Sequence, residues 1–151
     1  MRKNFYGTIE LNKTVDITDP CYDEDVWCRT NDFPVDPGTY ECYAWIKTDR
    51  ETHGFGKRVA KIALNKPGKV AIRYEEKAII GVDSGMAGFF TCDNKKYFED
   101  VILHTDVTCS DVFIDDGVFC SSSGFGDGGY GVYAGYDKNG ELVELQIRFI
   151  D

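Results

Sequence analysis

The sequence predicts a single all-β domain, built mainly of antiparallel strands as a sandwich or an open barrel, with one short α-helix. Polar and apolar residues alternate along much of the chain, which is the period of a strand with one face in a core. Residues 65–68 and 137–140 are turn sequences ending in Gly, each between two alternating segments, and both predict β-hairpins. A chain of 151 residues can bury its own core, so residues 1–151 are expected to form one domain.

The expected elements follow from these local patterns. Over residues 70–77 we expect Val70, Ile72 and Tyr74 to face the core. The intervening positions 73, 75 and 77 hold charged residues, which are expected to face water. An apolar stripe predicts the helix at residues 94–104. Residues 19–37 show no sustained period and are expected to form a structured loop. The predicted strands are residues 5–11, 38–47, 58–64, 70–74, 78–82, 87–91, 130–136 and 142–150.

Charge is distributed unevenly along the chain. The formal net charge is −9, yet residues 47–77 contain nine basic and four acidic residues, net +5, which leaves −14 on the rest. Such an asymmetry can steer an anionic ligand to one face of the molecule, although a solvated face of two strands is the simpler interpretation. No cluster of five or more basic residues occurs, so general nucleic-acid binding is not expected.

The six cysteines are expected to be free thiols, because the chain shows no sign of secretion. The first residues lack the apolar run of a secretion signal and no apolar stretch is long enough to span a membrane, so we expect a cytoplasmic protein without membrane contact. Cysteines in that compartment are free thiols. Their spacing, at positions 21, 28, 42, 92, 109 and 120, matches no zinc-binding pattern. Neither a metal nor another cofactor is therefore expected.

Residues 120–140 combine seven of the sixteen glycines with aromatic side chains. One interpretation is a bulged or tightly turned strand entry, where glycines let a neighbouring backbone or aromatic ring approach closely. The other is a ligand loop, in which backbone N–H groups and Asp127 bind a small polar molecule between Tyr130 and Tyr133. A phosphate cradle is less favoured, because no Lys-Ser/Thr pair follows and the next element is a strand.

A family resemblance adds to this segment. Residues 123–130, SGFGDGGY, continue through Tyr133 and residues 135–137 to Gly140, and residues 82–85 read VDSG. These motifs resemble the signatures SGxGDGxYxxYxGxDxxG and VDSG of a family of small bacterial and phage-associated proteins whose function is unassigned. Asp-Pro-Cys-Tyr at residues 19–22 also resembles a motif of related phage proteins. The resemblance supplies no catalytic residue, substrate or cofactor.

Both signature motifs pair a carboxylate with a flexible turn, and we expect them to form one site. The carboxylates of Asp83 and Asp127 are expected to cap their own loops beside one concave surface, with a modest pocket between them. The predicted ligand-binding residues are Asp83, Ser84, Gly85, Gly126, Asp127, Gly128, Tyr130 and Tyr133, and none is assigned a catalytic role. Gly126 and Gly128 are also expected to be backbone requirements.

The sequence favours a non-catalytic binding module for a small polar ligand or a protein partner, as a monomer or a dimer. A hydrolase using Asp83, Asp127 or both is the alternative, and it would need a second acid, a base or a metal nearby. A third hypothesis is an interaction protein that pairs through a sheet edge.

Overall fold

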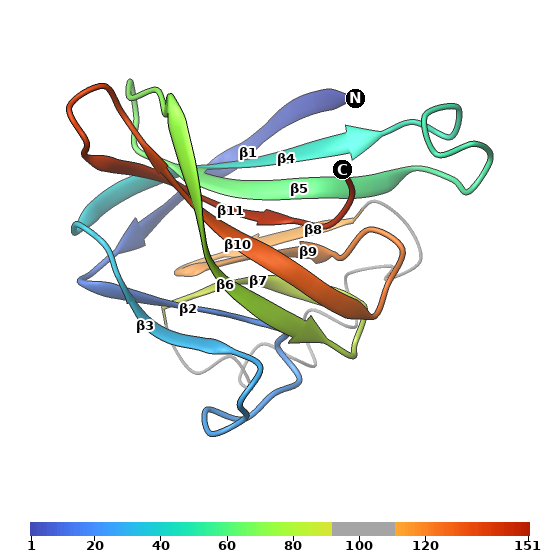
Figure 1. The fold of residues 1–151 in the computed structure, drawn as a ribbon, viewed down its shortest axis with the longest axis horizontal. Coiled ribbons are helices and arrows are strands. Elements are labelled where there is room, and N and C mark those ends of the chain that lie inside the picture. The colour runs from blue at the N-terminus through green and yellow to red at the C-terminus, as the bar shows by residue number, and fades with distance from the viewer. Residues whose placement is uncertain (92–110) are drawn as a thin grey trace.

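The protein is an open sandwich of two antiparallel sheets in a computed structural model that describes residues 1–91 and 111–151 (Figure 1). One sheet has six strands in the order β1-β4-β5-β11-β10-β6, and the other has five in the order β3-β2-β7-β9-β8. The sheets pack face to face without closing into a barrel, which confirms the all-β sandwich. The strands are β1 (Arg2–Leu11), β2 (Thr14–Thr18), β3 (Thr30–Pro34), β4 (Gly38–Lys47), β5 (Arg58–Asn65), β6 (Arg73–Val82), β7 (Met86–Phe90), β8 (Val112–Asp115), β9 (Val118–Ser122), β10 (Gly128–Tyr136) and β11 (Leu142–Arg148).

Most predicted strands are present. β4 has the expected bounds, and β5, β10 and β11 differ by no more than two residues at either end. The sequence prediction missed β2, β3, β8 and β9, of which β3 lies inside the stretch expected to be a loop. All five residues of β9 are buried, so this strand lacks the polar alternation that reveals a half-exposed strand. The predicted helix at residues 94–104 lies outside the described residues.

One of the two predicted hairpins is confirmed. β10 and β11 pair through residues 137–140, where the Gly140 N–H donates to the Asp137 carbonyl oxygen at 3.0 Å and Gly140 has φ +79°. The hairpin expected at residues 65–68 is wrong, because β5 pairs with β4 and β11 while β6 pairs with β10. β11, with five consecutive buried residues, takes the central place beside β5, and the charged β6 lies at the sheet edge.

The core-facing assignment of residues 70–77 is also wrong. Val70, Ile72 and Tyr74 are 72%, 68% and 39% exposed. Residues 70–72 precede β6 instead of forming a strand, and the Ile72 N–H donates to the Tyr136 carbonyl oxygen at 2.8 Å. This connection therefore runs along the margin of the six-stranded sheet, away from the core.

The core lies between the two sheets. Its buried side chains come from both layers and include Ile9, Ile62 and Leu145 of the six-stranded sheet and Ile17, Phe89 and Phe119 of the five-stranded one. Among the described residues, Cys21, Cys28, Cys42 and Cys120 are free thiols, and burial raises the pKa of Cys42 to about 12. None of the described residues belongs to a helix long and apolar enough to cross a membrane.

Candidate functional site

The two signature motifs meet at one end of the β6–β10 ladder (Figure 1). Val82, the last residue of β6, pairs with Gly128, the first residue of β10. Asp83 therefore leaves the ladder where Asp127 enters it. The expected proximity of the two motifs is present in the fold.

The carboxylate that organises this end is Asp19, which was not among the predicted site residues. Its side chain accepts hydrogen bonds from the N–H groups of Asp83 and Ser84, both at 2.7 Å, from the Ser84 hydroxyl at 2.7 Å and from the Cys21 N–H at 2.8 Å. Asp19 is completely buried. Asp83 does not cap its own loop as expected, and its carboxylate accepts a hydrogen bond from the Tyr22 hydroxyl at 2.8 Å. The Asp-Pro-Cys-Tyr motif thus holds the turn after β6.

Tyr130 supports the loop that leads into β10. Its hydroxyl donates to the Gly126 carbonyl oxygen at 2.5 Å, and its ring packs edge-on against Phe149 with centroids 5.1 Å apart. Gly126 has φ +115°, which agrees with a backbone requirement, whereas Gly128 at φ 159° is close to extended. Asp127 is exposed.

Tyr130 and Tyr133 do not form two walls of one pocket. Tyr130 packs against the core, whereas Tyr133 lies on the opposite, outer face of β10. There the Arg148 guanidinium carbon is 3.8 Å from the centroid of the Tyr133 ring. The predicted site residues are therefore divided between a braced turn and the outer face of the six-stranded sheet.

This outer face carries a row of side chains that crosses four strands. Lys3 of β1 pairs with Trp45 of β4, Trp45 pairs with Lys61 of β5, and Lys61 pairs with Arg148 of β11. Because directly opposed residues of neighbouring strands point to the same face, these four side chains lie in one line. The next row holds Tyr43, Ala63, Gln146 and Tyr133.

The cations in the first row stack on aromatic rings. The Lys3 ammonium is 4.1 Å from the Tyr43 centroid, and the Lys61 ammonium is 4.2 Å from the Trp45 centroid. Within the part of the chain that the structure describes, Lys3, Lys61 and Arg148 form no ion pair. Burial and the neighbouring charges of Arg148 and Lys3 lower the pKa of Lys61, which Glu144 partly opposes. An added anion would relieve this repulsion.

A buried polar network lies beside these cations, in the neighbouring rows of the outer face. Glu144 and Gln146 are 7% and 2% exposed although they point away from the core between the sheets. Glu144 accepts hydrogen bonds from the Tyr74 hydroxyl and the Gln146 amide, both at 2.6 Å, and Arg148 Nε donates to the Gln146 side-chain oxygen at 2.9 Å. Burial, followed by the bond to Glu144, raises the pKa of Tyr74. The network holds the Tyr74 ring and the Arg148 guanidinium in place.

A hollow of about 190 Å³ opens on this face. Lys3, Tyr43, Trp45 and Lys61 line one part of it, and Tyr74 with residues 69–71 lines another. Glu144 and Gln146 also contribute to its surface. Acidic and amide groups thus lie in the same hollow as two unpaired ammonium groups.

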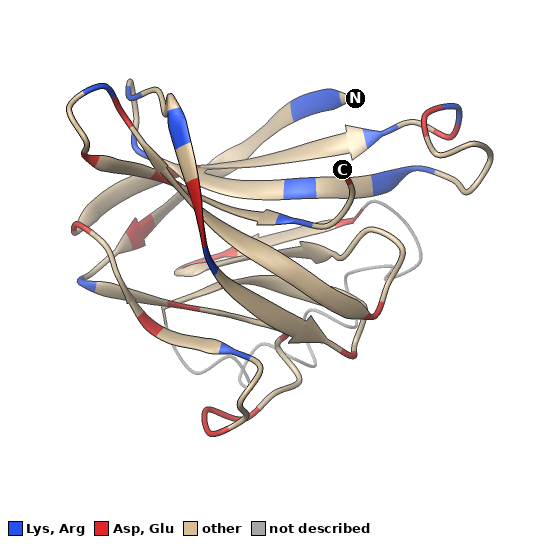
Figure 2. Ribbon diagram, in the orientation of Figure 1, with Lys and Arg blue, Asp and Glu red and all other residues tan. Residues whose placement is uncertain are grey.

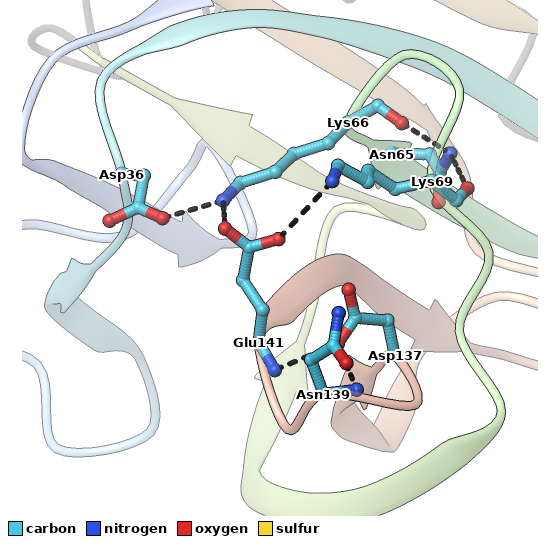
Figure 3. Close-up of polar contacts among 7 residues, drawn as sticks. All are labelled: Asp36, Asn65, Lys66, Lys69, Asp137, Asn139 and Glu141. Carbon is cyan, nitrogen blue, oxygen red and sulfur yellow. Dashed lines mark hydrogen bonds and ion pairs between the residues drawn. The ribbon is translucent and has the colours of Figure 1, made fainter.

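A second polar network anchors the wall made by residues 69–71. Figure 3 shows the Lys66 and Lys69 ammonium groups converging on Glu141, at 3.3 and 3.9 Å, while Lys66 also contacts Asp36 at 2.5 Å. The Asn65 amide donates to the carbonyl oxygens of Lys66 and Lys69 at 2.9 and 3.1 Å. The connection after β5 is thereby tied to the turn between β10 and β11.

Two glycines of β10 make room for aromatic rings on this face. A Cβ on Gly131 would lie 2.7 Å from Cε2 of Tyr133, and one on Gly135 would lie 2.9 Å from Cε1 of Tyr74. A Cβ on Gly135 would also lie 2.8 Å from the Ala71 Cβ. This confirms the interpretation that glycines of this segment let aromatic rings approach the strand.

Sequence reasoning missed most of the outer-face residues. Lys3, Tyr43, Trp45, Lys61 and Arg148 belong to four strands that are distant in sequence, and only their register brings them together. The available signal was the net positive segment that includes Lys61. In the described part of the chain, no three His, Cys, Asp or Glu side chains are grouped so as to hold a metal ion.

Comparisons with known proteins do not identify the chain. No family model matches it, and no curated protein and no solved structure matches it significantly. The resemblance to the family with the VDSG and glycine-aromatic signatures stays a prediction.

Proposed function

We propose that the protein is a non-catalytic binding module that holds a small anionic ligand on the outer face of its six-stranded sheet. The observation that carries the proposal is the row formed by Lys3, Trp45, Lys61 and Arg148, whose three cations have no carboxylate partner among the described residues. Unpaired cations beside a hollow with a fixed aromatic and polar lining suit recognition of a negative group.

The overall charge distribution supports the same face. Figure 2 shows many of the Lys and Arg residues on the six-stranded sheet, whereas the charged residues of the layer below are mostly Asp and Glu. The chain has a net charge of −9, so an anion is repelled from most of the surface. The field of the molecule therefore directs a small anion to the basic sheet.

The two alternatives draw less support from the geometry. A hydrolase using Asp83, Asp127 or both would need a second acid, a base or a metal nearby. The Asp83 carboxylate is held by the Tyr22 hydroxyl, and among the described residues no three His, Cys, Asp or Glu side chains are grouped so as to hold a metal ion. Pairing through the β6 edge is opposed by Arg73, Glu75, Glu76 and Lys77 in close succession. Charged residues of this kind protect edge strands from pairing with other chains.

Anion binding can be followed through Trp45. The chain has two tryptophans, and Trp27 is 92% exposed, so a Trp27→Phe protein reports on Trp45 alone. We expect inorganic phosphate at low ionic strength to change the Trp45 fluorescence in a saturable manner. In the same background, Lys61→Met should weaken phosphate binding about tenfold, because a charge-assisted hydrogen bond is lost.

Lys138→Met is the matched control. Lys138 is an exposed lysine in the turn between β10 and β11, outside the first row. This variant should bind phosphate with unchanged affinity. Equal losses in both variants would contradict a specific site, since they would show only a general effect of net charge.

Phosphate affinity should also depend on pH through Lys61. Its folded-state pKa lies below 10.5 because of burial, Arg148 and Lys3, with Glu144 opposing, and only the protonated amine attracts an anion. Affinity should therefore be full below this pKa and fall as the pH rises through it. Lys61→Arg should keep its affinity longer, because a guanidinium stays charged to a pH above about 12. Parallel phosphate titrations from pH 7 upward test this, and a wild-type affinity as persistent as that of Lys61→Arg would contradict it.

A further inference from the structure

We infer that the ligand is a single aromatic ring bearing one anionic group, a phosphate, sulfate or carboxylate, and this inference rests on the proposed function. The hollow joins two features that a simple inorganic anion would not use together. One is the pair of cations Lys3 and Lys61 from the first row, and the other is an aromatic lining formed by Tyr43, Trp45 and Tyr74.

The hollow is large enough to hold one ring. Its volume is about 190 Å³. An apolar cavity of about 150 Å³ accommodates benzene, and sites for larger organic ligands and cofactors start at about 300 Å³. A six-membered ring with one substituent therefore fits, whereas a dinucleotide would extend far beyond the hollow.

The lining favours a flat ring over a saturated one. Aromatic rings attract each other in offset-stacked or edge-on arrangements beyond the gain from buried area, which corresponds to about a threefold to tenfold difference in affinity. Tyr74 is fixed by its hydrogen bond to Glu144 and by the close approach of its ring to Gly135. Val70 and Ala71 add apolar surface next to it. These side chains therefore lose little conformational entropy when the ligand binds.

The charges in the hollow orient the ligand. Lys3 and Lys61 lie in the first row, and Arg148 continues that row on the next strand. Glu144 pairs in register with Asn65, four residues before Arg148 on β11, and lines the hollow together with residues 69–71. A negative group is attracted by the row and repelled by Glu144. The anionic group should therefore contact Lys3 and Lys61, with the ring directed toward Tyr74.

A longer polyanion fits the molecule less well. Residues outside 47–77 carry a net charge of −14, Glu144 lines the hollow, and Glu41 and Glu76 lie on the same sheet. Successive phosphates of a single strand would extend over this acidic surface. The charge pattern thus favours one anionic group.

Isothermal titration calorimetry with four probes tests this inference on the intact protein. The probes are inorganic phosphate, phenyl phosphate, cyclohexyl phosphate and a short oligothymidylate. We expect phenyl phosphate to bind at least about tenfold more tightly than inorganic phosphate. It should also bind at least about threefold more tightly than cyclohexyl phosphate. Tyr74→Leu should remove most of the preference for phenyl over cyclohexyl phosphate, because the ring is directed toward Tyr74, and Trp45→Leu should reduce the preference less, while phosphate still binds to both variants. Lys138→Met should leave all four affinities unchanged.

The outcomes separate the two proposals. If inorganic phosphate binds in a Lys61-dependent manner and phenyl phosphate binds no more tightly, the aromatic ligand is ruled out and the anion-binding module stands. If neither inorganic phosphate nor phenyl phosphate binds to the wild-type protein, both proposals fail. Tighter binding of the oligothymidylate than of phenyl phosphate would overturn the single-ring ligand in favour of a nucleic acid.

Discussion

Replacing Gly88 with Ala is expected to destabilise the protein by about 4 kcal/mol or more, a large part of the roughly 5–15 kcal/mol that stabilises a typical domain. Gly88 pairs with Cys120 between β7 and β9, at the centre of the five-stranded sheet. A Cβ there would lie 2.3 Å from the Phe119 carbonyl oxygen and 2.5 Å from the Cys120 Cα. Both are backbone atoms, so no rotamer change can relieve the overlap, and the strands would have to separate.

Urea denaturation followed by circular dichroism measures this effect. Gly129→Ala is the matched control, because Gly129 also lies in a strand and its added Cβ would have an ordinary contact of 3.6 Å with Ile79. The control should change the free energy of unfolding by no more than about 0.5 kcal/mol. A Gly88→Ala protein as stable as the control would refute the close strand approach.

Asp19→Asn is the second substitution with a large expected effect, a loss of about 3 kcal/mol of stability. Four donors converge on this buried carboxylate, three of them backbone N–H groups. An amide has one oxygen instead of two, and its NH₂ group would face donors. At least one buried N–H group would lose its partner, and the remaining bonds would lose their charge assistance.

The control for Asp19 also tests the site that the sequence predicts. Asp127 is exposed, and Asp127→Asn should leave stability unchanged within about 0.5 kcal/mol, as measured by urea denaturation. It should also leave phosphate affinity unchanged, since Asp127 does not line the hollow on the sheet. If phosphate binding depended on Asp127 and not on Lys61, the binding site would lie at the glycine-aromatic turn and not on the outer face of the sheet.

Local patterns predicted where the strands lie better than they predicted which strands pair with each other. The turn at residues 137–140 joins two adjacent strands because its hydrogen bonds and its positive-φ glycine lie within the turn itself. The similar turn at residues 65–68 does not, because β11 pairs with β5 in place of β6. Which strand takes a central position depends on how both faces of the whole sheet are buried. A short segment of the sequence does not contain that information.

The candidate site shows the same division. The sequence predicted that Asp83 and Asp127 would lie close together, and the pairing of β6 with β10 places them at one end of a ladder. It did not identify Asp19 as the carboxylate that holds the turn, because the contact joins residues 64 and 65 positions apart. Nor did it separate Tyr130 from Tyr133, whose opposite orientations follow from the core on one side of β10.

By itself the sequence determined the all-β class, the bounds of β4 and the glycine turn between β10 and β11, because each depends on alternation or turn geometry within a few residues. The tertiary structure alone decided that Lys3, Trp45, Lys61 and Arg148 form one row. The physical reason is register: strands distant in sequence become neighbours through hydrogen bonds that any backbone can make, and burial of the core face selects the pairing. The pairing that burial of the core face selects therefore also determines which side chains become neighbours on the outer face.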